Sequence, residues 1–255
     1  MLIAWDNLAD DATLTASSEQ ASAPGANVQN EHVAKKWYTA AGVTSATLLL
    51  DLTTSQSCAI LALLGANLTA AATIRLRGSD SDATGATGEK YDSGTISAGA
   101  KADYGSVYHS FTAAAARYWL LNIADASLSL LQVGRLFLGP KWTPTYNQVA
   151  GWSVAVIDES KISESYGFQS FADVRPLRRV LDFTLFSISE SEMFGNAFAM
   201  AMASGINADV LAVQDTAAAG YISEQSVFGL CQGSQPIVND QIGIFRQKFT
   251  IKERL

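Results

Sequence analysis

The sequence predicts a mainly β protein built from two parts, a large β-sandwich followed by a smaller β-sandwich domain with one packed α-helix. The chain has 255 residues, of which 48% are apolar and 16% charged, and this balance suits a large buried core. Short apolar segments bounded by turn residues recur through the first part, at the spacing of an all-β fold. The one strong helix signal comes later, at Ser189.

The first part is expected to begin with surface structure and to continue as regularly spaced strands. Residues 6–30 are polar and rich in Ala and Ser, so we expect a short strand and loops there. Further strands are expected at residues 46–52, 58–67, 72–78, 107–111, 117–123 and 130–138. In one of them, apolar residues alternate with Thr73, Arg75 and Arg77, which predicts one wet face. Residues 78–88 are expected to form an exposed loop.

A domain boundary is predicted at Gly139-Pro140. The first part ends there in two apolar strands, and Pro140 has no backbone N–H with which to continue a sheet. We therefore divide the chain into a sandwich at residues 1–139 and a smaller β-domain at residues 140–255.

The second part combines strands with one helix, expected at about residues 189–204. Ser189 and Glu192 have the spacing of a capping box, in which the serine accepts from the amide of Glu192 and the glutamate reaches back. Gly205 suits the left-handed end of the helix. We interpret its apolar residues as core rather than as a groove for a partner: Met193, Phe194, Ala197, Phe198, Ala201 and Met202. Strands are expected at residues 152–158, 179–186, 208–214, 225–231 and 243–251.

Several segments of the first part resemble discoidin-like, or galactose-binding-like, sandwiches. The resemblance rests on an early loop with Pro24 and Asn27, on Trp37, and on residues 48–52, 60–67, 75–80 and 117–120. It covers roughly residues 5–138. It implies an eight-stranded jelly roll whose loops at one end bind sugars or membranes, here residues 24–36 and 80–90.

A second resemblance covers about residues 130–255. It rests on residues 134–136, 142–144, 151–152, 175–179, the Ser-Glu-Ser-Glu start of the helix, and 249–253. These segments resemble structural proteins of the tail tip of long-tailed bacteriophages, of the distal-tail or baseplate type. In that group a β-sandwich with a flanking helix packs against copies of itself around the tail channel. The resemblance implies a homo-oligomeric ring, most simply a hexamer, that contacts the tail tube, tape measure and tail hub proteins.

The charge of the chain argues against nucleic-acid binding. The formal net charge is −7, and neither part carries a basic surface signature. The chain has no run of 18 apolar residues and no basic, apolar amino-terminal leader, so we expect no membrane or export targeting. Cys58 and Cys231 stand alone and are expected to be buried free thiols. The expected lack of targeting, together with the resemblance to phage proteins, predicts a virion protein that is assembled in the host cytoplasm.

No catalytic residue, metal site or cofactor is predicted. The two histidines, His32 and His109, lie outside any nucleophile, metal or phosphate motif, so we expect a non-enzymatic protein. Asp80 and Asp82 are the candidate ligand loop, because their carboxylates could bind calcium, although the glycine and glutamate of a calcium loop are absent. We favour a solvated loop there.

A charged cluster in the second part is the candidate oligomer interface. Its basic residues are Arg175, Arg178 and Arg179, and its acidic residues are Asp158, Glu159 and Glu164. Arginine pairs with carboxylates through two hydrogen bonds and is enriched at interfaces. We therefore interpret the cluster as a contact that sets the register between neighbouring copies.

Three functions from different classes remain open on the sequence. We favour a structural ring of a phage tail tip that joins the tail tube to the host-recognition apparatus, with residues 141–255 lining the channel. The alternative is a carbohydrate-binding module that contacts a host surface polysaccharide. An unrecognised hydrolase is the third.

Overall fold

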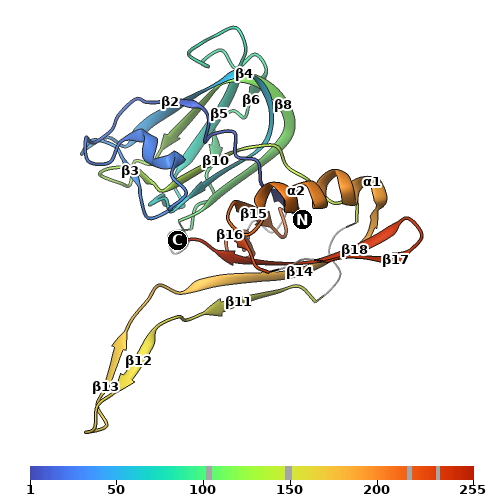
Figure 1. Cartoon of the computed structure of the whole chain (residues 1–255). Helices are drawn as coiled ribbons and strands as arrows, with labels where there is room; N and C mark the ends of the chain where they lie inside the picture. The colour runs from blue at the N-terminus through green and yellow to red at the C-terminus, as the bar shows by residue number, and fades with distance from the viewer. Residues whose placement is uncertain (102–104, 147–150, 217–219, 234–235) are drawn as a thin grey trace. The chain divides into compact units, whose positions relative to one another are not determined.

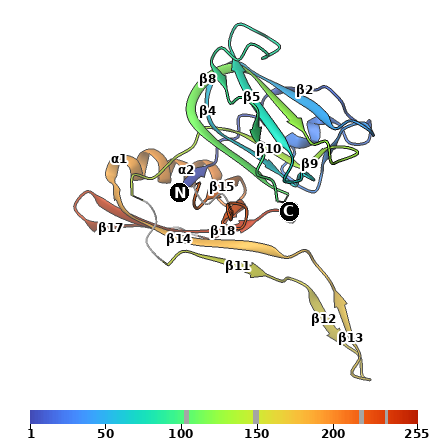
Figure 2. The ribbon, with the colours of Figure 1, turned by 180° about the vertical axis from the view of Figure 1, so that it is seen from behind.

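The computed structural model describes residues 1–101, 105–146, 151–216, 220–233 and 236–255 (Figures 1 and 2). The chain divides into two compact units. We call residues 2–142, 214–224 and 255 the sandwich unit, and residues 1, 143–213 and 225–254 the sheet-and-arm unit. The protein is mainly β with one short helical segment, so the predicted fold class is confirmed.

Antiparallel strands make up the sandwich unit. Their main sheet has the order β10-β4-β8-β5-β6, with β2 on β4 and β7 on β5, while β3 and β9 form a separate pair. The bounds are β1 (Leu2–Ala4), β2 (Thr13–Ala16), β3 (Trp37–Tyr38), β4 (Ser45–Leu64), β5 (Thr73–Ser79), β6 (Tyr91–Asp92), β7 (Ile96–Ser97), β8 (Val107–Ala124), β9 (Gln132–Val133) and β10 (Arg135–Gly139), with a 3₁₀ turn, η1 (Gly25–Gln29).

Four of the predicted strands are in fact two long ones. β4 and β8 pair along most of their length, and the register shifts between Asp51 and Gln56 and again between Cys58 and Ile60. Thr53 lies in the first shift with a φ of 63°. Such bulges bend a strand without ending it. The polar residues between Asp51 and Gln56 resemble a turn in the sequence, but in the structure they form a bend within β4. The first half of β4 also pairs with β2, and the second half with β10.

The core of the sandwich unit is built from the inward faces of these strands. Trp37 and Trp119 are fully buried, as are Leu48 and Leu50 of β4. Burying such large apolar side chains contributes roughly 1.5–3 kcal/mol each. Cys58 is a buried free thiol, as expected, and burial raises its pKa to about 12.

The sheet-and-arm unit holds a second antiparallel sheet and the helical segment. Its strands follow the order β15-β16-β18-β14-β11, and β17 pairs with β18. The bounds are β11 (Ser153–Ile157), β12 (Lys161–Glu164), β13 (Ser170–Asp173), β14 (Arg178–Ser189), α1 (Glu190–Glu192), η2 (Met193–Ala197, a π-helical turn), α2 (Phe198–Ser204), β15 (Asp209–Val213), β16 (Ser226–Cys231), β17 (Ile237–Gln241) and β18 (Ile244–Glu253). The sequence did not indicate β12, β13 or β17.

The helical segment buries only one of the two faces that carry its apolar side chains. Met193, Ala197 and Met200 are buried, whereas three large apolar side chains remain exposed: Phe194 (47%), Phe198 (43%) and Met202 (72%). The expectation that the whole stripe is core is therefore wrong. The apolar residues lie on two adjacent faces of the helical segment. Only one of these faces packs against the rest of the unit.

Ser189 caps the helical segment as predicted. Its hydroxyl accepts a hydrogen bond from the backbone N–H of Glu192 at 3.3 Å. The carboxylate of Glu192 also accepts from the backbone N–H of Thr145 at 2.9 Å, a partner that the capping-box pattern did not predict. Gly205 has a positive φ of 52°, but its ψ of −128° lies outside the left-handed helical region, so the predicted left-handed end is wrong in detail.

Replacing Ser189 by alanine should lower the free energy of unfolding by about 0.5–1 kcal/mol, since one helical N–H loses its acceptor. Chemical denaturation followed by circular dichroism measures the change. Ser191→Ala is the matched control, because it removes a hydroxyl that lies 3.3 Å from that of Ser189 but leaves the acceptor for the Glu192 N–H in place. An equal loss in both variants would contradict the capping role.

Candidate functional site

The outward face of β5 and β8 carries the polar residues of one candidate site. Ile74 and Leu76 point into the core, and the alternation of the strand turns Thr73, Arg75 and Arg77 outward, as predicted. The register places Asn122 of β8 opposite Arg75. Two sequence-distant segments therefore present their polar side chains on one surface.

A polar pocket of about 210 Å³ lies on this face. We call it the β5–β8 groove. Its lining residues are Thr73, Ile74, Arg75, Arg77, Thr95, Asn122 and Ala124. None of them is aromatic. A ligand here would be held by hydrogen bonds rather than by ring stacking.

The two arginines of the groove have different partners. Arg75 forms a bidentate ion pair with Asp92, with Nε–Oδ1 and Nη2–Oδ2 distances of 2.9 and 2.6 Å. This hydrogen-bonded pair lowers the pKa of Asp92 to about 2, so its carboxylate is charged at neutral pH. Arg77 instead donates to neutral oxygens, the backbone carbonyl of Ala86 at 2.6 Å and Oδ1 of Asn122 at 2.9 Å. The Nε atom of Arg77 is buried and has no hydrogen-bond partner among the residues that the structure describes.

The neighbouring loop, residues 80–90, is held by its own carboxylates. Asp82 accepts from the hydroxyl and backbone N–H of Thr84, and from the N–H of Thr87. Asp80 accepts from the backbone N–H of Arg117 at 2.9 Å and lies 3.3 Å from the ammonium of Lys90. The candidate ligand carboxylates are thus engaged by donors of the chain. Among the described residues, no group of three or more His, Cys, Asp or Glu side chains is placed to hold a metal ion.

Four of the six charged residues predicted as an oligomer interface form ion pairs within the chain: Glu159, Arg175, Arg178 and Arg179. Arg179 forms a bidentate ion pair with Glu253 across β14 and β18, and both side chains are largely buried. The structure places Arg178 3.8 Å from Glu159, which also pairs with Lys252. The remaining members of the cluster are exposed residues: Asp158, Glu164 and Arg175. Arg175 lies 3.5 Å from Asp173.

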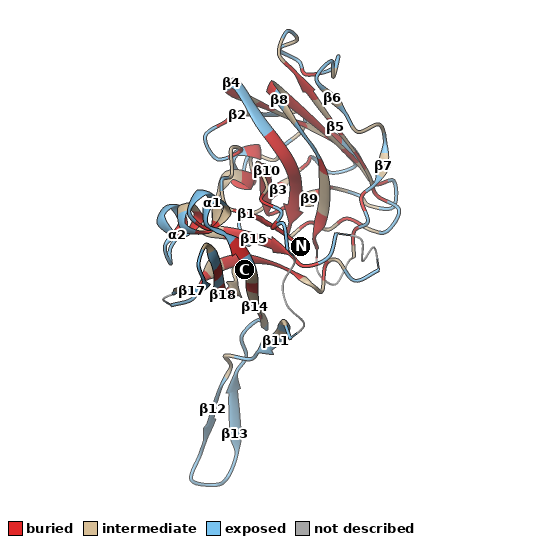
Figure 3. Cartoon of the chain, turned by 90° about the vertical axis from the view of Figure 1, so that its right-hand side faces the viewer, coloured by how far each residue is buried: buried red, intermediate tan, exposed pale blue. Residues whose placement is uncertain are grey.

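A long exposed hairpin is the second candidate site. Residues 158–177, which we call the arm, extend between β11 and β14 and contain the paired strands β12 and β13 (Figure 3). Every residue from Lys161 to Leu177 is exposed. Six of them are large and apolar: Ile162, Tyr166, Phe168, Phe171, Val174 and Leu177, with exposed fractions between 57 and 109%. Phe168 also has a positive φ of 58°, which is rare for a bulky residue.

The histidines stay apart from both sites. His109 lies in β8, where its Nε2 atom is 2.8 Å from the hydroxyl of Tyr91, and burial lowers its pKa. His32 is an exposed loop residue 3.6 Å from Glu31. No helix in the described part of the chain is long and apolar enough to cross a membrane.

The comparisons with known proteins concern the fold. A scan against family models and a search of the curated proteins each found no match. Among solved structures, a chitosan-binding module from a Paenibacillus chitosanase/glucanase is 20% identical, and the similarity covers 53% of this chain and 99% of that one, with a TM-score of 0.40. The family 32 carbohydrate-binding module of Clostridium perfringens NanJ, in complex with galactose, is 10% identical over 56% and 100% of the two chains, with a TM-score of 0.42.

A fucose-binding module from Streptococcus pneumoniae is similar to the same extent. It is 13% identical over 53% of this chain and 95% of that one, with a TM-score of 0.41. These values describe a distant likeness of fold over about half of the chain. They do not assign a ligand to the groove.

Proposed function

We propose that the sandwich unit is a non-enzymatic carbohydrate-binding module whose ligand lies in the β5–β8 groove. The observation that supports this most directly is the groove itself, a polar hollow of about 210 Å³ that is lined by two threonines, two arginines and an asparagine. Sites for drug-sized ligands usually measure about 300–1,000 Å³. The groove therefore suits a single sugar ring, such as the end of a host surface polysaccharide.

The side chains of the groove match the hydroxyl groups of a sugar. Thr73 and Thr95 bring hydroxyls that both donate and accept. The oxygen of Asn122 accepts from Arg77, and its amide N–H groups, which have no partner in the described part of the chain, would donate to a ligand. Without an aromatic platform, affinity depends on these polar contacts, so we expect weak binding to one ring and tighter binding when several modules act together.

Titration of the full chain with sugars tests this function. Galactose, fucose and chitosan oligosaccharides are the first ligands, since the similar solved structures bind them. Removing the amide donors by Asn122→Ala should weaken binding about tenfold, and calorimetry or NMR shift titration measures the loss. Thr15→Ala is the matched control, an exposed β2 residue of the same sheet outside the groove. No binding to neutral or acidic sugars, or equal losses in both variants, would refute the proposal.

A second candidate function rests on the arm. Soluble proteins seldom expose several large apolar side chains along one segment unless a partner covers them. A second copy of the chain would cover the arm of its neighbour, and β11 is an edge strand whose outer hydrogen-bonding groups a neighbour would also cover. The same unit carries the exposed helical residues Phe194, Phe198 and Met202.

This second proposal is a homo-oligomeric structural ring, of the kind found in phage tail tips. In such a virion protein the sheet-and-arm unit would join copies, and the sandwich unit would present the sugar site to a host. Native mass spectrometry of the full chain is the direct test, with a multiple of 27.1 kDa, most simply six copies, as the expected mass. A monomer at all accessible concentrations would refute it.

A further inference from the structure

The β5–β8 groove is a basic site on an acidic chain. The formal net charge of the protein is −7, yet the lining of the groove contains two arginines and no carboxylate. Asp92 neutralises Arg75 through two hydrogen bonds. The hydrogen bonds of Arg77 end on a backbone carbonyl and a side-chain amide. Asp92 is also its partner in the β5–β6 register and interacts with its charge, so one carboxylate faces two arginines.

We propose that the sugar bound in this groove carries a carboxylate, as a uronic acid does, and that Arg77 and Asn122 hold that carboxylate. This inference rests on the proposed carbohydrate-binding function and names the chemical class of its ligand. The neutral hydroxyls of the same sugar would meet Thr73 and Thr95.

The excess of positive charge is the first argument for an anion. Two guanidiniums line the groove, and one carboxylate, that of Asp92, acts on both of them. Carboxylates accept guanidinium hydrogen bonds in a geometry that neutral hydroxyls do not match, and these bonds are about twice as strong.

The surplus of donors is the second argument. Among the described residues, Arg75 uses Nε and Nη2 and has no partner at Nη1, and the amide N–H groups of Asn122 have no partner either. The lining side chains therefore offer N–H donors from three residues, and their acceptors are the two threonine hydroxyls and the Asn122 oxygen, which already accepts from Arg77. These donors are best matched by a ligand that has more hydrogen-bond acceptors than a neutral sugar, whose hydroxyl groups must also donate.

The scaffold fixes these donors before a ligand arrives. Arg77 is held at both Nη atoms, by loop residue Ala86 and by Asn122 of β8. The ion pair with Asp92 holds Arg75 in the same way. Because both guanidiniums are already oriented, little side-chain entropy is lost on binding.

The test compares sugars that differ only in the acid group. We expect the full chain to bind galacturonate about tenfold more tightly than galactose, and glucuronate about tenfold more tightly than glucose, with a preference that falls as salt is added. Arg77→Gln should remove the preference, whereas Arg77→Lys should keep part of it. Arg246→Gln, which removes an exposed arginine of the sheet-and-arm unit, should leave it unchanged.

Three other results would contradict the proposal. If galactose and galacturonate bind equally at the groove, the acid proposal fails and the carbohydrate function stands. If neither binds, both fail. If acetate competes as well as galacturonate does, the groove recognises an anion and not a sugar, which also overturns the proposal. Circular dichroism of Arg77→Gln verifies that the variant is folded, and Arg77→Lys decides the point if it is not.

Discussion

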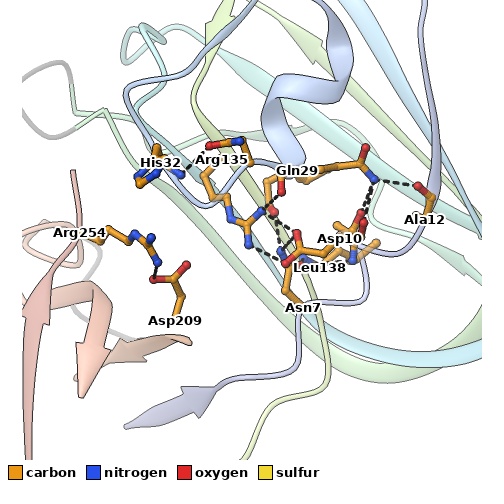
Figure 4. Close-up of polar contacts among 12 residues, drawn as sticks. Asn7, Asp10, Ala12, Gln29, His32, Arg135, Leu138, Asp209 and Arg254 are labelled. Carbon is orange, nitrogen blue, oxygen red and sulfur yellow. Dashed lines mark hydrogen bonds and ion pairs between the residues drawn. The ribbon is translucent and has the colours of Figure 1, made fainter. Parts of the chain in front are cut away.

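Replacing Asp10 by alanine should destabilise the sandwich unit by about 4 kcal/mol, and replacing its partner Arg135 by methionine should cost only about 2 kcal/mol. The guanidinium of Arg135 donates through Nη1 and Nη2 to the two carboxylate oxygens of Asp10, both at 2.6 Å, and also to the carbonyl of Gln29 (Figure 4). These bonds fasten the amino-terminal loop to β10. Asn7 extends the network, because it bonds to Asp10 and to the backbone of β10.

The two costs differ because the partners are buried to different extents. The side chain of Arg135 is 4% exposed and that of Asp10 is 37% exposed. Loss of Asp10 takes two carboxylate hydrogen bonds away from a buried cation, whereas loss of Arg135 leaves a carboxylate that water can reach. Chemical denaturation of the full chain, followed through the tryptophans of the sandwich core, measures both values.

The double variant is the control for this argument. Its cost should be smaller than the sum of the two single losses, because it never leaves a charge unpaired. A larger loss from Arg135→Met than from Asp10→Ala, or full additivity in the double variant, would contradict the interpretation.

The second large effect concerns the arm. Replacing Tyr166, Phe168 and Phe171 together by serine should abolish self-association, so that native mass spectrometry gives only the 27.1 kDa chain. The stability of the single chain should change by less than about 0.5 kcal/mol, because these side chains are exposed and add little to the fold.

Ile242→Ser provides the matched control for the arm. Ile242 lies between β17 and β18 of the same unit and is fully exposed, so its replacement removes exposed apolar surface outside the arm. Unchanged assembly in the arm variant would refute the role of the arm. Replacing Arg179 is a poor test of assembly, because its ion pair with Glu253 belongs to the fold.

The strands that the sequence predicted well are those with one buried and one wet face. Residues 72–78 and 179–186 alternate clearly, and the structure has β5 and β14 there. The arm could not be predicted in this way. Its strands are exposed on both faces, so no burial imposes a period on residues 161–164 or 170–173.

The groove could be predicted only in part. The alternation in β5 indicated that Arg75 and Arg77 point outward. Their neighbour Asn122 lies 45 residues further along the chain from Arg77, and only the antiparallel register of β5 and β8 brings it to them. The alternation of residues within one strand predicts which way a side chain points. It does not predict which strands are paired, and the site depends on that pairing.

The continuous strands β4 and β8 have a consequence for how the sandwich unit forms. Each strand continues through the bend at the register shifts, and their pairing joins residues 45–64 to residues 107–124. These contacts close loops of many tens of residues before they bring any stabilisation, and such topologies fold slowly. Because the same two strands continue on both sides of the bend, neither side can form its sheet without the other. We therefore expect a single slow folding phase for this unit and uniformly late hydrogen exchange along both strands.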